Sequence, residues 1–228
     1  MTLSAVALAA RNNAEWCDAV ARSHGGEAAF ADGYWINRGE APPTYPNLVT
    51  LTPEPERAMA AISGAIDAAP DRAFSVKDSF QRLDLAPLGF APLLEATWIR
   101  RAAIPLTGGR TQFVRDAETL ARWEEAWGER DAALFRPALL AEPEHAFIAA
   151  TAEGRILAGC VASRSSAVVG VSNLFGPAAL QADCIAAAMD FGPGRTVVGY
   201  EPGAALARMK RWGFQALGRL RVWVRPAA

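Results

Sequence analysis

The chain has 228 residues, of which 51% are hydrophobic and 21% are charged, a balance typical of one large globular domain or two small ones. The formal net charge is −1, so the chain lacks the basic field that nucleic-acid binding requires. No stretch approaches the roughly 20 apolar residues of a membrane-spanning helix, so we expect no membrane association.

The N-terminal segment predicts a helix over residues 3–23 and not a secretion signal. Its apolar residues lie on one helical face, Ser4 or Thr2 can cap it, and it ends near Gly25-Gly26. It lacks the basic start of a signal peptide, and its apolar run is short for one. We therefore expect a cytoplasmic protein.

Polar residues within this helix and aromatic residues after it do not fit a simple core pattern. Asn12 and Asn13 are adjacent and unfavourable in a helix, so either the helix breaks there or their amides bind another group. Tyr34, Trp35 and Tyr45 lie among glycines and prolines, in a segment typical of a long loop. Such a loop either forms a lid or substrate wall, or packs between the two halves of the chain.

The next elements alternate between strands and helices. In chain order we expect a strand at 47–51, a helix at 54–68, and strands at 72–80 and 93–101. The segment 102–111 contains a proline, two glycines and little to bury. We therefore predict two domains, residues 1–106 and 107–228.

The second half is predicted to contain more strands than the first. Asp116 caps a helix expected at 116–127. The elements after it are strands at 145–151, 155–163 and 167–175, a helix at 177–190, a strand at 195–200, a helix at 203–212 and a strand at 217–224. The fold class is therefore mixed α/β (α+β).

The two halves repeat one another at a nearly constant spacing. At an offset of 123 residues the matches are Leu51 with Leu174, Ile62 with Ile185, Asp67 with Asp190, Pro70 with Pro193 and Arg72 with Arg195. With slight further drift, Gly89-Phe90 matches Gly213-Phe214 and Trp98 matches Trp223. This order indicates a tandem pseudo-repeat of strand-helix-strand-helix-strand. The alternative is chance agreement between alanine-rich helices.

Tryptophans and cysteines mark the expected core, and the cysteines and histidines do not predict a metal site. We expect burial of Trp16, Trp98, Trp123, Trp223, Cys160 and Cys184, which lie on apolar segments. Cys17 is not close to another cysteine, and His24 and His145 stand alone. Because structural zinc needs four clustered ligands, we expect no metal, and the odd cysteine count favours a reducing compartment.

Residues of about 110–228 resemble the GNAT (N-acetyltransferase) superfamily. The element order of helix, three strands, helix, strand, helix, strand is that of the family. Gly213-Phe214, with Ala205 before it, is similar to the pattern that closes the family's last helix. The resemblance implies a GNAT-like fold and an acyl-CoA-dependent N-acyltransferase, with the first half as a partial copy.

The resemblance implies that acetyl-CoA binds where the fourth strand of the second half meets the next helix. In the family, a loop of the form Arg/Gln-x-x-Gly-x-Gly/Ala holds the pyrophosphate, and the pantetheine arm lies between the fourth and fifth strands. The matching residues are Ser172, Asn173, Leu174, Phe175, Gly176, Pro177, Ala178 and Ala179. This segment has one glycine, no leading Arg or Gln, and a proline that removes one N–H. We therefore expect weak or no acetyl-CoA binding, with Arg164 or Arg208 as a replacement cation.

The family's chemistry implies a base for the amine and often a tyrosine that protonates the departing thiolate. That tyrosine precedes the Gly-Phe pair by four residues, where this chain has Met209. Tyr200 is the available substitute, and Glu201 or Glu144 could serve as the base. Structural alternatives are a strand-end aromatic for Tyr200, a helix cap for Glu201 and a solvated loop charge for Glu144.

Two functions therefore remain open from the sequence. One is an N-acyltransferase with a degenerate phosphate loop, acting on an unidentified small-molecule amine or peptide. The other is a GNAT-like protein that has lost the chemistry and binds a ligand or a partner, which Met209 and the incomplete loop favour. A homodimer could form through residues 219–224 if that strand has an open edge.

Overall fold

The computed structural model describes residues 3–103, 109, 111–128 and 133–227, which form two compact units. Unit 1 combines Met1–Trp98, Tyr200–Ala207 and Ala216–Ala228, and unit 2 combines Ile99–Gly199 and Arg208–Gln215. Each unit thus takes segments from both halves of the chain. Most of the predicted boundary segment 102–111 lies outside the described residues, and the division into 1–106 and 107–228 stays a prediction.

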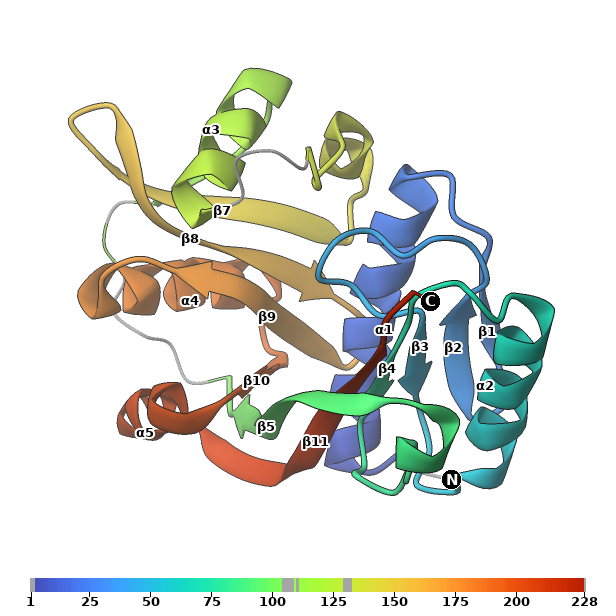
Figure 1. The fold of residues 1–228 in the computed structure, drawn as a ribbon. Helices are drawn as coiled ribbons and strands as arrows, with labels where there is room; N and C mark the ends of the chain where they lie inside the picture. Colours follow the sequence, from blue (N-terminus) through green and yellow to red (C-terminus); the bar gives the residue numbers. More distant parts are fainter. Residues whose placement is uncertain (1–2, 104–108, 110, 129–132, 228) are drawn as a thin grey trace. The chain divides into compact units, whose positions relative to one another are not determined.

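The described elements follow the predicted alternation of helices and strands (Figure 1). The helices are α1 (Ala5–Ser23), α2 (Glu56–Ala68), η1 (Ala86–Leu88), α3 (Ala117–Trp127), η2 (Pro137–Ala141), α4 (Ala178–Phe191) and α5 (Gly203–Arg211). The strands are β1 (Ala28–Ala31), β2 (Tyr34–Asn37), β3 (Leu48–Thr50), β4 (Phe74–Asp78), β5 (Ala91–Arg101), β6 (Thr111–Phe113), β7 (His145–Ala152), β8 (Arg155–Arg164), β9 (Val168–Phe175), β10 (Thr196–Glu201) and β11 (Gln215–Arg225).

Helix α1 runs unbroken through the adjacent asparagines. Its cap is Ser4, whose hydroxyl oxygen accepts the Ala7 N–H at 3.2 Å, while Thr2 lies outside the described residues. The Asn13 amide oxygen accepts a hydrogen bond from Lys77 Nζ at 2.7 Å. Of the two alternatives for this segment, the second is therefore correct, because the helix persists and the amide binds another group.

The predicted loop around Tyr34 and Trp35 is instead a β-hairpin, β1–β2, packed on α1. Trp35 is fully buried, and its Nε1 donates to Asp18 at 2.8 Å. The Tyr45 hydroxyl accepts from Trp16 Nε1 at 2.8 Å. All three side chains belong to unit 1, where Tyr45 lines a pocket together with Val224 of β11 and Tyr34 packs against a buried cluster that includes Trp223. A substrate wall and packing between the two halves of the chain therefore both stay predictions.

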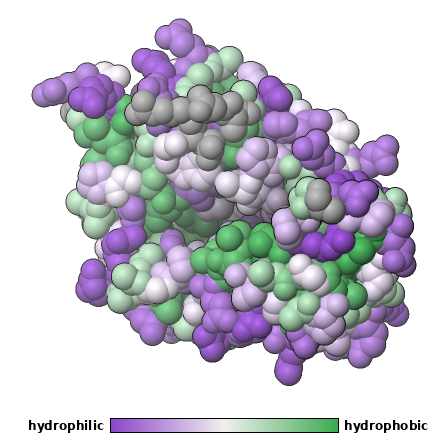
Figure 2. Space-filling model, viewed as in Figure 1, coloured by the Kyte–Doolittle hydropathy of each residue, from purple (hydrophilic) through white to green (hydrophobic). Residues whose placement is uncertain are grey.

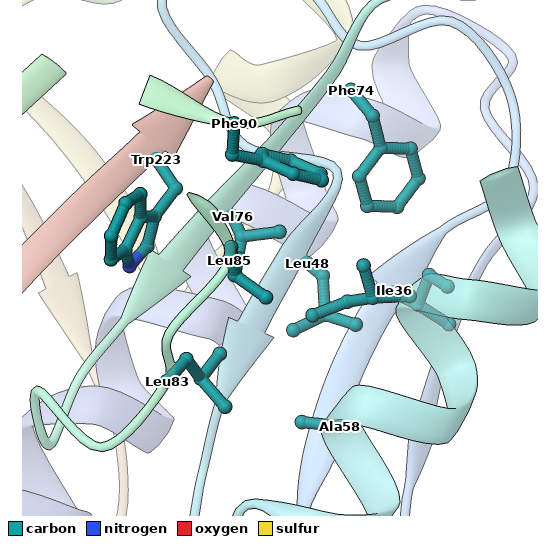
Figure 3. Close-up of a cluster of buried hydrophobic side chains, with 10 residues drawn as sticks. Ile36, Leu48, Ala58, Phe74, Val76, Leu83, Leu85, Phe90 and Trp223 are labelled. Carbon is teal, nitrogen blue, oxygen red and sulfur yellow. The ribbon is translucent and has the colours of Figure 1, made fainter. Parts of the chain in front are cut away.

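The sheet of unit 1 has the strand order β1-β2-β3-β4-β11-β5. Strands β3 and β4 are parallel, whereas β11 is antiparallel to β4 with Trp223 opposite Val76. One face of this sheet packs on α2 through a cluster of buried apolar side chains (Figure 3). Its buried members are Ile36, Leu48, Ala58, Ile62, Phe74, Val76, Leu83, Leu85, Phe90 and Trp223.

The last strand of the second half therefore completes the sheet of the first half. Because β11 lies between β4 and β5 in the strand order, it has no open edge. The condition for dimerisation through residues 219–224 is thus not met. The oligomeric state itself stays a prediction.

The sheet of unit 2 has the strand order β10-β9-β8-β7-β6, with helices on both faces. Neighbouring residues of a strand point to opposite faces, and Gly159 of β8 lies against Trp123 of α3 while Cys160 contacts Cys184 of α4. Helices α3 and α4 thus cover opposite faces. Around Trp123, the rings of Phe135, Phe147 and Phe175 make edge contacts with centroids 5.1–5.6 Å apart.

The repeat predicted from the sequence is present in the order of elements. The first copy is β3-α2-β4-η1-β5 and the second is β9-α4-β10-α5-β11. In each copy the strands before and after the long helix are parallel partners. The copies differ in the fourth element, which is a short 3-10 helix in the first and a nine-residue α-helix in the second.

The burial of the four tryptophans is also confirmed. Trp16, Trp98, Trp123 and Trp223 are each at most 4% exposed. Hydrophilic side chains border much of the visible face, with hydrophobic areas between them (Figure 2). None of the helices in the described residues is long and apolar enough to cross a membrane.

Candidate functional site

The candidate cofactor site is the junction where β9 passes into α4. The strand ends at Phe175, Gly176 turns the chain with φ +95°, and Pro177 stands at the N-cap of α4. A Cβ at Gly176 would lie 2.4 Å from the Leu157 carbonyl oxygen, so this position accepts only glycine without rearrangement. The Gly176 carbonyl oxygen accepts from Gln181 Nε2 at 2.8 Å, which fixes the turn.

The first turn of α4 contains backbone donors that have no acceptor among the described residues. The Gln181 N–H bonds to the Pro177 carbonyl oxygen at 3.0 Å and closes the turn. Ahead of it, the N–H groups of Ala178, Ala179 and Leu180 have no acceptor in the described part of the chain. Residues 176–179 are exposed, and the first turn has no acidic side chain. The positive end of the helix dipole and these donors together suit an anion.

Strand β9 is distorted just before this junction. Two steps along β8, from Gly159 to Val161, face three steps along β9, from Phe175 to Ser172. The extra residue forms a β-bulge that includes Asn173, whose φ is +52°. The Ser172 hydroxyl beside the bulge is buried without a partner among the described residues.

Strand β10 pairs with β9 over only part of its length. The parallel register in the described residues covers Thr196–Val198 and Val168–Gly170. Tyr200 and Glu201 follow at the carboxyl end of β10, beyond that register. The bulge of β9 likewise lies on the carboxyl side of the register.

Solved structures share this architecture, although no protein-family model and no curated protein sequence matches the chain. A GCN5-related N-acetyltransferase from Kribbella flavida superposes with a TM-score of 0.69 over 100% of this chain and 98% of its own, at 16% identity. A conserved protein of unknown function from Staphylococcus epidermidis gives 0.62, with 89% and 95% covered at 11% identity. A tandem GNAT protein from the clavulanic acid biosynthesis pathway gives 0.53, with 99% and 97% covered at 15% identity.

The chain has the GNAT fold. The tandem GNAT neighbour spans almost the whole of this chain, which agrees with the repeated order of elements. In the second GNAT copy, β9 and β10 are the fourth and fifth strands of the resemblance. Residues 172–179, predicted as the cofactor site, span the bulge of β9 and the start of α4, and their role stays a prediction.

The equivalent junction of the first GNAT copy is unsuited to an anion. At the offset of 123 residues, Glu56 of α2 stands where the second copy has Ala179. Glu54 precedes it, and Pro53 and Pro55 lack backbone N–H groups. Like α4, α2 begins after a proline N-cap and its first hydrogen bond is that of Met59 N–H to the Pro55 carbonyl oxygen, so the two helix ends differ in the negative charge of Glu54 and Glu56 and not in the number of free donors.

The Phe175 side chain and the two candidate arginines do not serve the junction as the sequence suggested. The Phe175 ring packs on Trp123 at 5.1 Å, so only its backbone is available to a ligand. Arg164 lies opposite Val169, six residues and about 20 Å along β9 from Phe175, and its guanidinium donates to the Pro143 carbonyl oxygen. The prediction of Arg164 as the replacement cation is therefore wrong. The Arg208 guanidinium lies over the Trp212 ring at 5.9 Å, and no contact joins Arg208 to Gly176 among the described residues.

Among the candidate acids and bases, Glu144 is the one that lies far from the β9–α4 junction. Glu144 is exposed at the start of β7, next to Arg164, and thus lies at the opposite end of the strands from Gly176. Its prediction as the base is therefore wrong for a reaction at the β9–α4 junction. Glu201 is half-buried after Tyr200, and Met209 is 3% exposed, so Met209 is a packing residue.

Tyr200 contacts a residue that sequence reasoning missed. Its hydroxyl oxygen accepts from Lys77 Nζ at 3.1 Å, and its ring meets Trp98 edge-on with centroids 5.3 Å apart. Lys77 is 5% exposed, between β4 and α1. Burial lowers the pKa of Lys77, the negative charge of an ionised Tyr200 raises it, and the balance lies above its ordinary value. In the structure Lys77 Nζ acts only as a donor, to Asn13 and to Tyr200, as an ammonium group does.

The cysteines and acidic residues form no metal cluster in the part of the chain that the structure describes. Cys17, Cys160 and Cys184 are free thiols and are buried. Burial raises the pKa of the Cys17 thiol. A hydrogen bond to Cys184 and burial raise that of Cys160, so both are protonated core residues at neutral pH.

Proposed function

We propose that this protein is an acyl-CoA-dependent N-acyltransferase whose acyl donor binds at the β9–α4 junction of the second GNAT copy. The observation that carries the proposal is the contrast between the two junctions. Both helices begin with three N–H groups without acceptors in the described residues, but no acidic side chain lies in the first turn of α4, whereas Glu54 and Glu56 lie at the start of α2. The pyrophosphate of the coenzyme would take the first site and be repelled by the second.

In the proposed reaction, the amine attacks the thioester carbonyl and the carbon–sulfur bond breaks. Tyr200 gives its hydroxyl proton to the departing thiolate, and Glu201 accepts the proton that the amine loses. The products are an amide and coenzyme A, and the proton on Glu201 returns through solvent to Tyr200. The acceptor is a small-molecule amine or peptide, and we place the reaction in the cytoplasm.

We expect weak binding of acetyl-CoA. Two or three hydrogen bonds and the helix dipole together supply on the order of 2–4 kcal/mol, which alone supports only millimolar affinity. None of the hydrogen bonds described for residues 176–181 involves a cationic side chain.

The test is a titration with acetyl-CoA followed by the amide NMR signals of Ala178 and Leu180. Ala179→Glu installs the residue of the first copy, and Ala179→Gln is its neutral control. The Ala179→Glu variant should bind about tenfold or more weakly because of charge repulsion, while the Ala179→Gln variant binds like the wild type. A carboxylate in the first turn favours the helix, so neither variant should melt earlier. Equal binding by the two variants would show that acetyl-CoA binds at another site. Submicromolar binding by the wild type would refute the expectation of weak binding at an incomplete phosphate loop.

A second candidate is a GNAT-fold protein that binds a ligand or partner without transferring an acyl group. Met209 favours it, because this buried thioether occupies the place of the family's acid. Release of coenzyme A from acetyl-CoA in the presence of primary amines separates the two. Turnover supports the transferase, and binding without turnover of any amine supports the second candidate.

A further inference from the structure

A buried ammonium ion lies against the tyrosine proposed as the acid. Lys77 Nζ donates to Asn13 Oδ1 at 2.7 Å and to Tyr200 Oη at 3.1 Å, and it lies 4.6 Å from the centre of the Tyr200 ring. Neither acceptor is a carboxylate, and no carboxylate bonds Nζ in the described residues. A buried charge without a counterion is costly, so its retention calls for an explanation.

The direction of the hydrogen bond fixes what the phenol can do. An ammonium group has donors only, so Tyr200 Oη must accept from Lys77. The phenol O–H is then free to donate elsewhere. The edge contact with Trp98, at 5.3 Å, restricts the ring and thus the direction in which the O–H can point.

The same contact favours the state that follows proton loss. A tyrosine that gives up its proton becomes a phenolate, and an adjacent ammonium ion in a buried site stabilises that charge. The pKa of Lys77 is raised in the same way, by the negative charge of an ionised Tyr200 and, to a smaller extent, of an ionised Cys17.

We infer that Lys77 is a positioning residue, which presents Tyr200 as the proton donor of the acyl transfer and stabilises the phenolate left when the proton moves to the thiolate sulfur. The inference rests on the proposed function. At the offset of 123 residues, Lys77 is the first-copy equivalent of Tyr200, so the two copies supply different members of one pair. The first copy, whose own junction repels an anion, thereby contributes to the chemistry of the second.

The first experiment needs no ligand. The chain has only two lysines, Lys77 and Lys210, so labelling lysine with carbon-13 at Cε gives two NMR signals, which Lys210→Met assigns. The Tyr200→Phe variant keeps Lys77 buried but removes the phenol. The titration of Lys77 should therefore move to lower pH. An unchanged Lys77 titration would overturn the inference.

The second experiment measures turnover of acetyl-CoA with a panel of primary amines. Lys77→Met should lower kcat about tenfold or more with little change in the KM for acetyl-CoA, because the lysine acts through Tyr200. Lys210→Met, an exposed lysine on α5, is the matched control and should equal the wild type. Lys77→Arg keeps the positive charge and should therefore have a kcat between those of Lys77→Met and the wild type. If Lys77→Met folds poorly, Lys77→Arg is the variant to compare with the wild type.

The double variant Lys77→Met with Tyr200→Phe decides whether the two residues act as one unit. It should be no slower than Tyr200→Phe alone, because the lysine has nothing left to position. Additive losses, or equal turnover by Lys77→Met and Lys210→Met, would overturn the inference. Coenzyme binding without any turnover by the wild type would overturn the acyl transfer and this role with it. Absence of coenzyme binding would instead refute the proposed function, whatever the Lys77 titration shows.

Discussion

At the scale of single residues, two tryptophans at equivalent positions of the repeat differ in hydrogen bonding. Trp98 Nε1 donates to the Ser79 carbonyl oxygen at 2.9 Å, whereas Trp223 Nε1 is buried without a partner in the described residues. Both side chains are at most 4% exposed. The same substitution should therefore have different costs at the two sites.

We predict that Trp98→Phe lowers the free energy of unfolding by about 1–3 kcal/mol more than Trp223→Phe does, because it leaves a buried carbonyl unpaired. Urea unfolding of the two variants measures the difference. Truncation of either residue to alanine should cost roughly 3–5 kcal/mol, which controls for the loss of volume. Equal losses in the two phenylalanine variants would contradict the role assigned to the Ser79 bond.

The residues of the site differ in how far the sequence could predict them. Tyr200 could be proposed because it ends a recognisable strand next to a glutamate. Lys77 could not, because it lies on the polar side of an alternating strand and its partners Asn13 and Tyr200 are 64 and 123 residues away. A contact between residues so far apart leaves no local pattern in the sequence.

At the scale of elements, the β9–α4 junction depends on the shape of Gly176. Its φ of +95° disfavours any side chain, and a Cβ would also meet Ala158 at 2.5 Å. Gly194 has a similar φ of +74° but nothing within 4 Å of its Cβ position. Alanine substitutions at Gly176 and Gly194 therefore distinguish the cost of backbone strain from the cost of steric overlap.

We predict that Gly194→Ala costs about 1–2 kcal/mol of stability through its backbone alone. Gly176→Ala should cost about 1–3 kcal/mol more, through overpacking against β8. Thermal or urea unfolding measures both. Equal costs would show that β8 yields to the added methyl group. A charged residue at Gly176 would therefore test packing before it tests anion binding, which is why Ala179 is the better site.

The strands and helices of the second half could be predicted because their periodic patterns are long and are bounded by Gly, Pro or a cap such as Asp116. The β1–β2 hairpin was missed although Asp32-Gly33, between Ala31 and Tyr34, is a typical two-residue turn. The glycines and prolines that follow concealed this signal. Strand β6 has only three residues, too few for a periodic pattern, and takes its conformation from pairing with β7.

At the scale of the whole molecule, the sheet of unit 1 depends on the end of the chain. Strand β11 pairs with β4 from Phe74 to Asp78. The unit 2 strand β8 is bordered by β7 and β9 and has no such dependence. Loss of β11 should therefore affect the two sheets unequally.

We predict that truncation after Phe214 abolishes hydrogen-exchange protection in β4 while β8 keeps most of its protection. Adding a peptide of residues 215–228 should restore protection in β4, and the same peptide with Trp223→Asp should not, because Trp223 packs in the cluster of Figure 3. Mass spectrometry of exchanged peptides reads out both strands. Equal loss in β4 and β8 would contradict the unequal dependence of the two sheets on β11.

The pairing of β4 with β11 also determines how long β4 stays unpaired while the chain is synthesised. Asp78 leaves the ribosome long before its partner Arg221, with more than a hundred residues between them. At roughly 5–20 residues per second, the nascent chain carries an unpaired β4 edge for on the order of ten seconds. An exposed edge strand is prone to pair with other chains, so rare codons between the two strands should lower the yield of native protein in the cell.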